Sequence, residues 1–213
     1  MQYSKQDIDQ MDRIQKIKFI NSISGIKPAN LIGSVSNSGQ VNLAIFSSVF
    51  HLGSDPALLG FITRPTGEIP RHTLENIKEN KQYTINHVNS SFTEKAHYTS
   101  AKFERGQSEF KICGLTEEYI GDFKAPFVKE SGIKMGMEFK EAIDIKLNGT
   151  ILVIGEIQHL IIPEKALGED EDIDLSNINT VGISGLNTYY ELKKISRYPY
   201  ARVNQIPDFD AEI

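Results

Sequence analysis

Val41-Asn42-Leu43-Ala44-Ile45-Phe46-Ser47-Ser48-Val49-Phe50 is the stretch of sequence that decides the fold. It reads as a core strand, yet Asn42, Ser47 and Ser48 offer hydrogen bonds where an ordinary core strand has none. A buried polar group must find a partner or cost about 1–3 kcal/mol. The stretch therefore indicates a strand that borders an internal site or a bound ligand.

The sequence on both sides of this stretch predicts more strands. Residues 14–63 are expected to be strands throughout, with residues 14–19 leading in and residues 31–35 forming a short apolar run. Asn37-Ser38-Gly39 has the composition of a hairpin turn. A further apolar run follows at residues 57–62.

The second half of the chain predicts a long hairpin. Residues 83–88 alternate like a strand, and residues 142–162 form two alternating runs on either side of Asn148-Gly149, a typical turn dipeptide. Hairpins without regular intervening helices favour an antiparallel barrel over a doubly wound sheet.

Two short helices are expected between these strands. Thr73 is a typical N-cap for a helix over residues 74–81, because its hydroxyl can accept an unpaired helix N–H. Residues 92–101 have apolar side chains at helical spacing. Residues 168–174 form an acidic surface loop in which Asp170 lies, without the glycine and glutamate positions of a calcium loop.

Length and composition narrow the class of protein. The 213 residues suit one domain, residues 1–213, and the net charge of −5 argues against a nucleic acid or an anionic membrane as partner. Cys113 is the only cysteine, which excludes an intrachain disulfide and favours a reducing compartment, the cytoplasm. No stretch has the apolar length of a signal peptide or membrane helix.

Familiar catalytic and metal-binding motifs are absent from the sequence. It contains no G-x-G-x-x-G, P-loop, H-E-x-x-H or G-x-S-x-G, and its histidines show no zinc-site pairing. A Rossmann dinucleotide site is thus disfavoured, and no metal is expected.

An anion site is predicted around Arg71-His72-Thr73. The guanidinium groups of Arg64 and Arg71 can each pair two oxygens of a phosphate, and Thr73 adds a hydroxyl at a helix start. The alternative interpretation is that Arg71 is a surface charge and Thr73 only a cap.

Several segments in the same order resemble the flavin reductase-like, FMN-binding split-barrel family, most closely its flavoredoxin-like branch. The resemblance spans roughly residues 14–202 and implies a mainly β fold, an antiparallel split β-barrel with a few short helices. It rests on Asn30 to Gly33, Asn42 to Val49, Arg64-Pro65, Arg71 to Ile77, His97 to Ala101, Ser108 to Phe110, Ala125 to Val128 and Asn148 to Thr150.

The resemblance implies noncovalent binding of FMN, with the flavin carrying the chemistry and no catalytic side chain. The implied cofactor-binding residues are Asn30, Ser34, Asn42, Ala44, Ser47, Ser48, Arg64, Arg71, Thr73, Asn76, His97 and Ser100. Structural alternatives remain for several of them. Asn42, Ser47 and Ser48 can instead bond to neighbouring backbone, Asn76 can fix a turn, and His97 can be a structural histidine.

The implied reaction is hydride transfer from NADH or NADPH to the flavin, which then passes electrons to an acceptor. A flavoredoxin-like electron carrier reduced by a protein partner, and a nonenzymatic FMN-binding module, are the alternatives. The resemblance also implies a homodimer. Four tyrosines lie near the C-terminus: Tyr189, Tyr190, Tyr198 and Tyr200. As core residues they would cover the end of the barrel. In a homodimer, residues 198–202 would instead pack on the partner.

Overall fold

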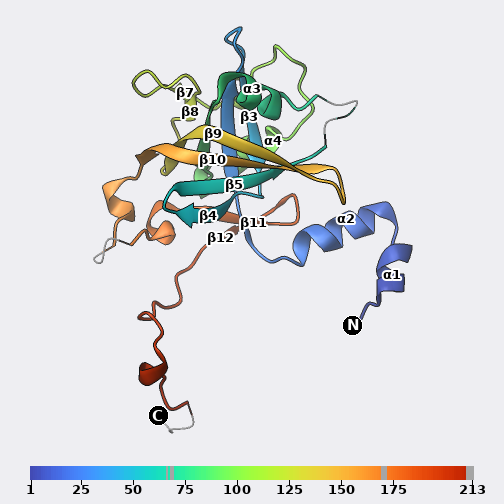
Figure 1. Cartoon of the computed structure of the whole chain (residues 1–213), viewed down its shortest axis with the longest axis vertical. Coiled ribbons are helices and arrows are strands. Elements are labelled where there is room, and N and C mark those ends of the chain that lie inside the picture. The colour runs from blue at the N-terminus through green and yellow to red at the C-terminus, as the bar shows by residue number, and fades with distance from the viewer. Residues whose placement is uncertain (66, 68–69, 169–171, 210–213) are drawn as a thin grey trace.

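A curved seven-stranded antiparallel sheet forms the body of the computed structural model (Figure 1). The structure describes residues 1–65, 67, 70–168 and 172–209. The strand order is β3-β2-β6-β9-β10-β5-β4, so β3 and β4 lie at its two edges. The strands are β2 (Asn30–Val35), β3 (Val41–Phe46), β4 (Phe50–Ser54), β5 (Ala57–Thr63), β6 (Gln82–His87), β9 (Lys134–Ile145) and β10 (Thr150–Ile161).

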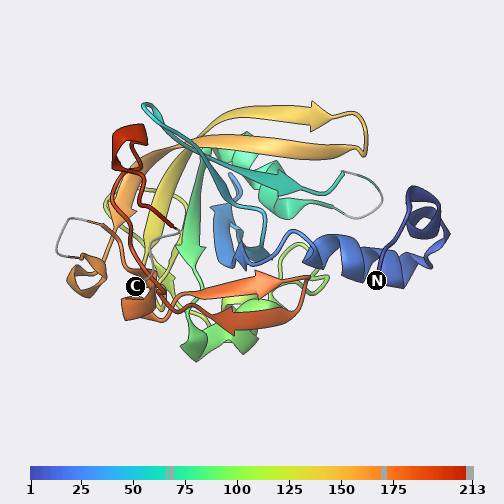
Figure 2. The same cartoon turned by 90° about the horizontal axis from the view of Figure 1, so that it is seen from below.

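Two smaller sheets and several short helices surround this body (Figures 1 and 2). One sheet contains β1 (Lys27–Pro28), β11 (Val181–Ser184) and β12 (Thr188–Glu191), and the other β7 (Glu117–Glu118) and β8 (Phe127–Val128). The α-helices are α1 (Lys5–Gln10), α2 (Arg13–Ser22), α3 (His72–Asn80), α4 (Thr93–Tyr98) and α5 (Glu109–Cys113). Single 3-10 turns are η1 (Ser90–Phe92), η2 (Glu164–Ala166), η3 (Leu175–Ile178) and η4 (Val203–Gln205).

Both predicted hairpins are confirmed. Val35 pairs with Val41 across the first turn, where Gly39 has φ +83°, a conformation that favours glycine. Thr150 pairs with Ile145 across the second, where Gly149 has φ +73°. This second hairpin is longer than predicted, because β9 begins at Lys134.

The sheet separates two hydrophobic cores. Ile32, Phe61 and Tyr83 belong to the inner core, which α3 covers through Leu74 and Ile77. The opposite faces of β2 and β3 join a second core, formed with α4, α5 and β11, whose members include Leu31, Leu43, Val88, Phe92, Phe110 and Val181. Every residue of β2 is therefore buried.

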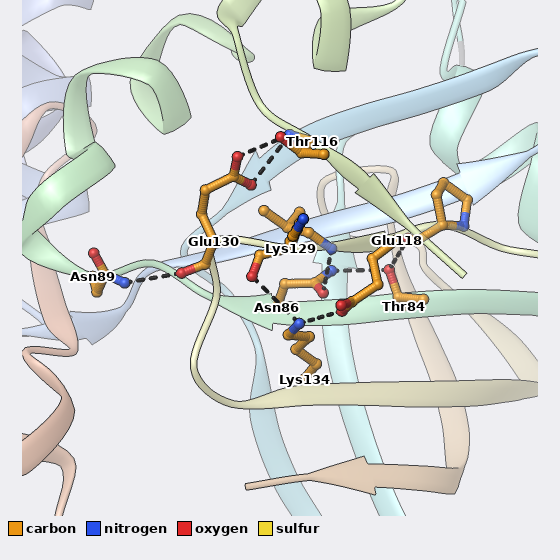
Figure 3. A network of polar contacts seen from close by, with 10 residues as sticks. Thr84, Asn86, Asn89, Thr116, Glu118, Lys129, Glu130 and Lys134 are labelled. Carbon is orange, nitrogen blue, oxygen red and sulfur yellow. Dashed lines mark hydrogen bonds and ion pairs between the residues drawn. The ribbon is translucent and has the colours of Figure 1, made fainter. Parts of the chain in front are cut away.

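Two buried polar side chains of β6, Thr84 and Asn86, find hydrogen-bond partners inside the protein (Figure 3). Asn86 donates from Nδ2 to Leu31 O and Thr84 Oγ1, and its Oδ1 accepts the Val128 N–H. Nearby, the buried Lys134 pairs with Glu118 on β7. These contacts fix β7 and β8 to the outer face of the large sheet.

The expectation of strands from residue 14 is wrong for α2. Ile14, Ile17 and Ile20 recur every three residues, which is a helical spacing, and Asp12 caps the helix by accepting the N–H groups of Ile14 and Gln15. No residue of α2 is buried. The predicted helix over residues 92–101 is confirmed as η1 followed by the shorter α4.

The C-terminal tyrosines only partly form core. Tyr189 packs against the second core, whereas Tyr198 and Tyr200 are 81% and 85% exposed, so the core interpretation is wrong for these two. They lie on an arm that runs away from the body (Figure 1). Of the acidic loop, Asp170 lies outside the described residues. In the described part of the chain, no helix has the length and hydropathy needed to cross a membrane.

Candidate functional site

Four of the predicted site residues converge between the sheet and α3. Asn42 on β3 donates from Nδ2 to Thr73 Oγ1 at 2.9 Å, and Asn76 donates from Nδ2 to Ser34 Oγ at 3.2 Å. Ser34 and Asn42 are direct partners in the β2–β3 register. All four side chains are buried. Residues far apart in the sequence thus form one polar cluster, Ser34–Asn42–Thr73–Asn76.

The predicted capping role of Thr73 is wrong. Helix α3 begins two residues earlier than expected, at His72, and its N-cap position is Arg71, which makes no side-chain capping bond. The Thr73 hydroxyl is engaged by Asn42 instead. A tertiary hydrogen bond to β3 has replaced the local bond that the sequence suggested.

A small surface hollow adjoins this cluster. It is lined by residues 40–42 of the β2–β3 hairpin, by His72 and Asn76 of α3, and by the loop of residues 104–107. Its free volume of about 10 Å³ is close to the space that one water needs. Arg105 pairs with Glu75 at 3.2 Å, which ties the loop to α3. The loop therefore covers the approach to Asn42 and Asn76.

The two arginines of the predicted anion site lie beside α3. Arg71 Nε donates to Pro65 O at 3.2 Å, and this leaves the terminal guanidinium nitrogens as further donors. Arg64 is exposed just after β5. The structure brings Arg71 next to the segment that follows Arg64, as the anion site requires.

The outer edge of β3 carries the next contact. Leu43 N–H donates to Glu109 Oε2 at 3.0 Å, so the Leu43 backbone faces away from β2. Backbone groups of alternate residues face the same edge of a strand, and Ile45 consequently presents its N–H there too. Ala44 faces Ile32 within the sheet.

Ser48 supports the structural alternative. Its hydroxyl donates to Ile62 O at 2.9 Å and accepts the Ile62 N–H at 3.1 Å, so it joins the β3–β4 connection to β5. Ser47 beside it is half-buried. The structure places both serines at the end of β3 but outside the cluster under α3.

Asn30 lies at the other end of β2, opposite His87 on β6. Asn30 Oδ1 and His87 Nδ1 are both buried, and neither has a hydrogen-bond partner in the described part of the chain. Burial lowers the pKa of His87 from 6.5 to about 4. The pair forms a second polar position on the inner face, separate from Ser34 by the length of the strand.

His97 and Ser100 are not brought to the cluster. His97 Nδ1 lies 3.2 Å from Tyr189 Oη, and Ser100 Oγ donates to His97 O. They belong to α4 and the turn after it, and α4 packs through Ala96 on the core that contains Leu43. Asn42, by contrast, faces α3.

Sequence reasoning missed Glu109 and Arg105 as neighbours of the site. Glu109 is only 5% exposed, and buried carboxylates are too rare to expect from an isolated Glu in a sequence. Both residues lie in the segment 104–109, which only the tertiary structure brings beside β3 and α3.

The sequence matches one known protein family. The model of the flavin reductase like domain matches residues 26–180, well over half of the chain. The chain belongs to the flavin reductase like family. Family membership indicates flavin-related oxidoreduction and agrees with the expected family.

Solved structures agree with this assignment to the flavin reductase like family. A candidate flavin reductase with a split barrel domain from Shewanella frigidimarina is 49% identical, with a TM-score of 0.90, over 94% of this chain and 100% of that one. Two more distant structures share the fold. Nitrilotriacetate monooxygenase component B from Bacillus cereus is 18% identical, with a TM-score of 0.81, over 93% of this chain and 98% of that one. Flavoredoxin of Desulfovibrio vulgaris is 19% identical, with a TM-score of 0.71, over 83% of this chain and 92% of that one. The fold is therefore the expected antiparallel split β-barrel, mainly β with short helices.

The low pKa of His87 predicts a loss of stability in acid. The unfolded chain takes up a proton near pH 6.5 and the native state only near pH 4, so the free energy of unfolding falls as pH drops between these values. The full loss is roughly 3 kcal/mol, at about 1.4 kcal/mol per pKa unit. Urea unfolding at pH 7 and pH 4.5 measures it. The free energy of unfolding of His87→Gln should fall clearly less than that of wild type. His51→Gln, a control at an exposed position, should lose as much as wild type. Equal losses in wild type and His87→Gln would contradict the assignment.

Proposed function

We propose that the protein is an FMN-binding oxidoreductase that reduces its flavin with NADH or NADPH by hydride transfer and passes the electrons to an acceptor. The buried cluster Ser34–Asn42–Thr73–Asn76 beside Arg71 is the observation that carries this proposal. Membership of the flavin reductase like family supports the flavin. Buried polar groups at a sheet end, next to cationic groups, suit a ligand with a phosphate and a polar ring edge.

The chain's residues fit an FMN. Arg71 and Arg64 would bind the phosphate, because Arg71 keeps guanidinium donors beyond the one bonded to Pro65. Amide, hydroxyl and backbone groups of β3 and the segment after it would orient the polar part of the cofactor. The bound flavin would supply hydride chemistry. His97 and Ser100, on the other side of β3, would contact the outer face of the bound FMN.

The visible absorption spectrum of the purified protein tests this function. FMN is added if the preparation is colourless, and NADH or NADPH is then added without oxygen. We expect a flavin spectrum that bleaches with one of the donors. A flavin that resists both donors would favour an electron carrier reduced by a protein partner. Failure to bind flavin would refute the proposal.

Substitution of Arg71 tests the phosphate site. Arg71→Ala should raise the dissociation constant for FMN about tenfold or more, because a hydrogen bond to a charged group contributes about 1.5–3 kcal/mol. Fluorescence titration measures it, with the circular dichroism spectrum as a check of folding. Arg13→Ala on α2 is the matched control and should change the constant less than about twofold. An unchanged affinity in Arg71→Ala would remove Arg71 from the site.

A homodimer is the assembly that we propose for this function. Tyr198, Tyr200 and Phe209 are each more than four-fifths exposed on the C-terminal arm. Three such rings leave roughly 400–600 Å² of apolar surface in water, as much as the largest patch of a typical monomer. Packing on a second copy would bury it.

Size-exclusion chromatography with light scattering, which measures the mass of the protein in solution, tests the dimer. Wild type should have twice the mass of the chain, and the double variant Tyr198→Asp, Tyr200→Asp should shift toward the monomer, because buried charge disfavours the interface. Leu147→Asp, at a 99% exposed position of the β9–β10 turn, is the control and should stay dimeric. A monomeric wild type would contradict the proposal.

A further inference from the structure

Strand β3 is an edge strand, and its outer edge is held by a single carboxylate. Among the residues that the structure describes, no strand pairs with β3 on the side away from β2. Glu109, the first residue of α5, reaches this edge and accepts the Leu43 N–H with Oε2 at 3.0 Å. An open strand edge leaves backbone donors and acceptors without partners, so such a contact fixes where the strand lies.

The burial of Glu109 makes this contact unusual. Glu109 is 5% exposed. In the part of the chain that the structure describes, it forms no ion pair. Desolvation raises the pKa of the carboxyl group, opposed by the hydrogen bond from Leu43. Burial of a carboxylate without an ion pair costs free energy, and the hydrogen bond from Leu43 offsets part of that cost.

One face and the outer edge of β3 are held at adjacent residues. Asn42 points inward and donates to Thr73 on α3, while Leu43 is held from outside by Glu109 on α5. Because successive residues of a strand are rigidly connected, a displacement of Leu43 also displaces Asn42 and the N–H of Ile45. The strand is thus clamped between two helices at the position where it meets the polar cluster.

We propose that Glu109 is a positioning residue for the flavin: through Leu43 it holds β3 at the place where Asn42 and the outer backbone edge can bind FMN. This inference rests on the proposed function. Glu109 acts on the cofactor only through β3 and takes no part in the chemistry.

Three variants test the proposal. Glu109→Ala removes the acceptor, and Glu109→Gln keeps an oxygen that can accept the same N–H. Glu130→Ala is the matched control, because Glu130 also accepts a backbone N–H, but that of Thr116 and not one of β3 (Figure 3). Thermal unfolding of each variant shows that it is folded. Glu109→Gln keeps the test valid if Glu109→Ala does not fold.

FMN titration is the first measurement. Glu109→Ala should raise the dissociation constant at least tenfold, Glu109→Gln less than about threefold, and Glu130→Ala less than about twofold. A purely structural Glu109 would lower the melting temperature in Glu109→Ala and leave the affinity unchanged. That result would overturn the proposal, as would a tenfold loss in Glu109→Gln that matched Glu109→Ala.

Amide hydrogen exchange of the flavin-free protein separates the two proposals. Exchange at residues 41–46 should be faster in Glu109→Ala than in wild type, and unchanged in Glu130→Ala. Failure of wild type to bind FMN would refute the proposed function. Unchanged exchange at residues 41–46 would refute the role of Glu109 in holding β3, whether or not wild type binds FMN.

Discussion

Burial of β2 between two hydrophobic cores is the constraint on which the rest of the structure depends. A strand that faces apolar side chains on both sides has no water to satisfy the polar groups that it carries. Ser34 on β2 and Asn86 on β6 therefore need partners from other elements. These partners determine where α3 and the β7–β8 segment lie.

The same constraint produces the candidate site. Helix α3 supplies Thr73 and Asn76 to the inner face of β2 and β3, and in doing so it brings Arg71 beside the polar cluster. The segment before α5 covers this region from outside, through the Arg105–Glu75 ion pair and the Glu109 contact. A ligand at β3 would thus be bordered by a sheet edge and two helices whose positions are set by buried hydrogen bonds.

The terminal segments follow different rules from the body. Helix α2 has no buried residue, and the C-terminal arm carries exposed aromatic rings. A helix of ten residues is marginal alone in water. A second copy would give both segments the contacts that a single chain does not supply.

The sequence by itself determined most strands of the large sheet, the two hairpins and the family. Periodicity and turn dipeptides depend on residues close in sequence, so Gly39 and Gly149 could be placed from the sequence alone. The resemblance also implied Ser34, Asn42, Thr73 and Asn76, among twelve cofactor-binding residues. Only the tertiary structure decided that Thr73 bonds to Asn42 rather than capping α3, and that Ser48 binds Ile62. Each of these outcomes is a competition between a local bond and a partner from a distant segment, and that partner is present only in the folded chain.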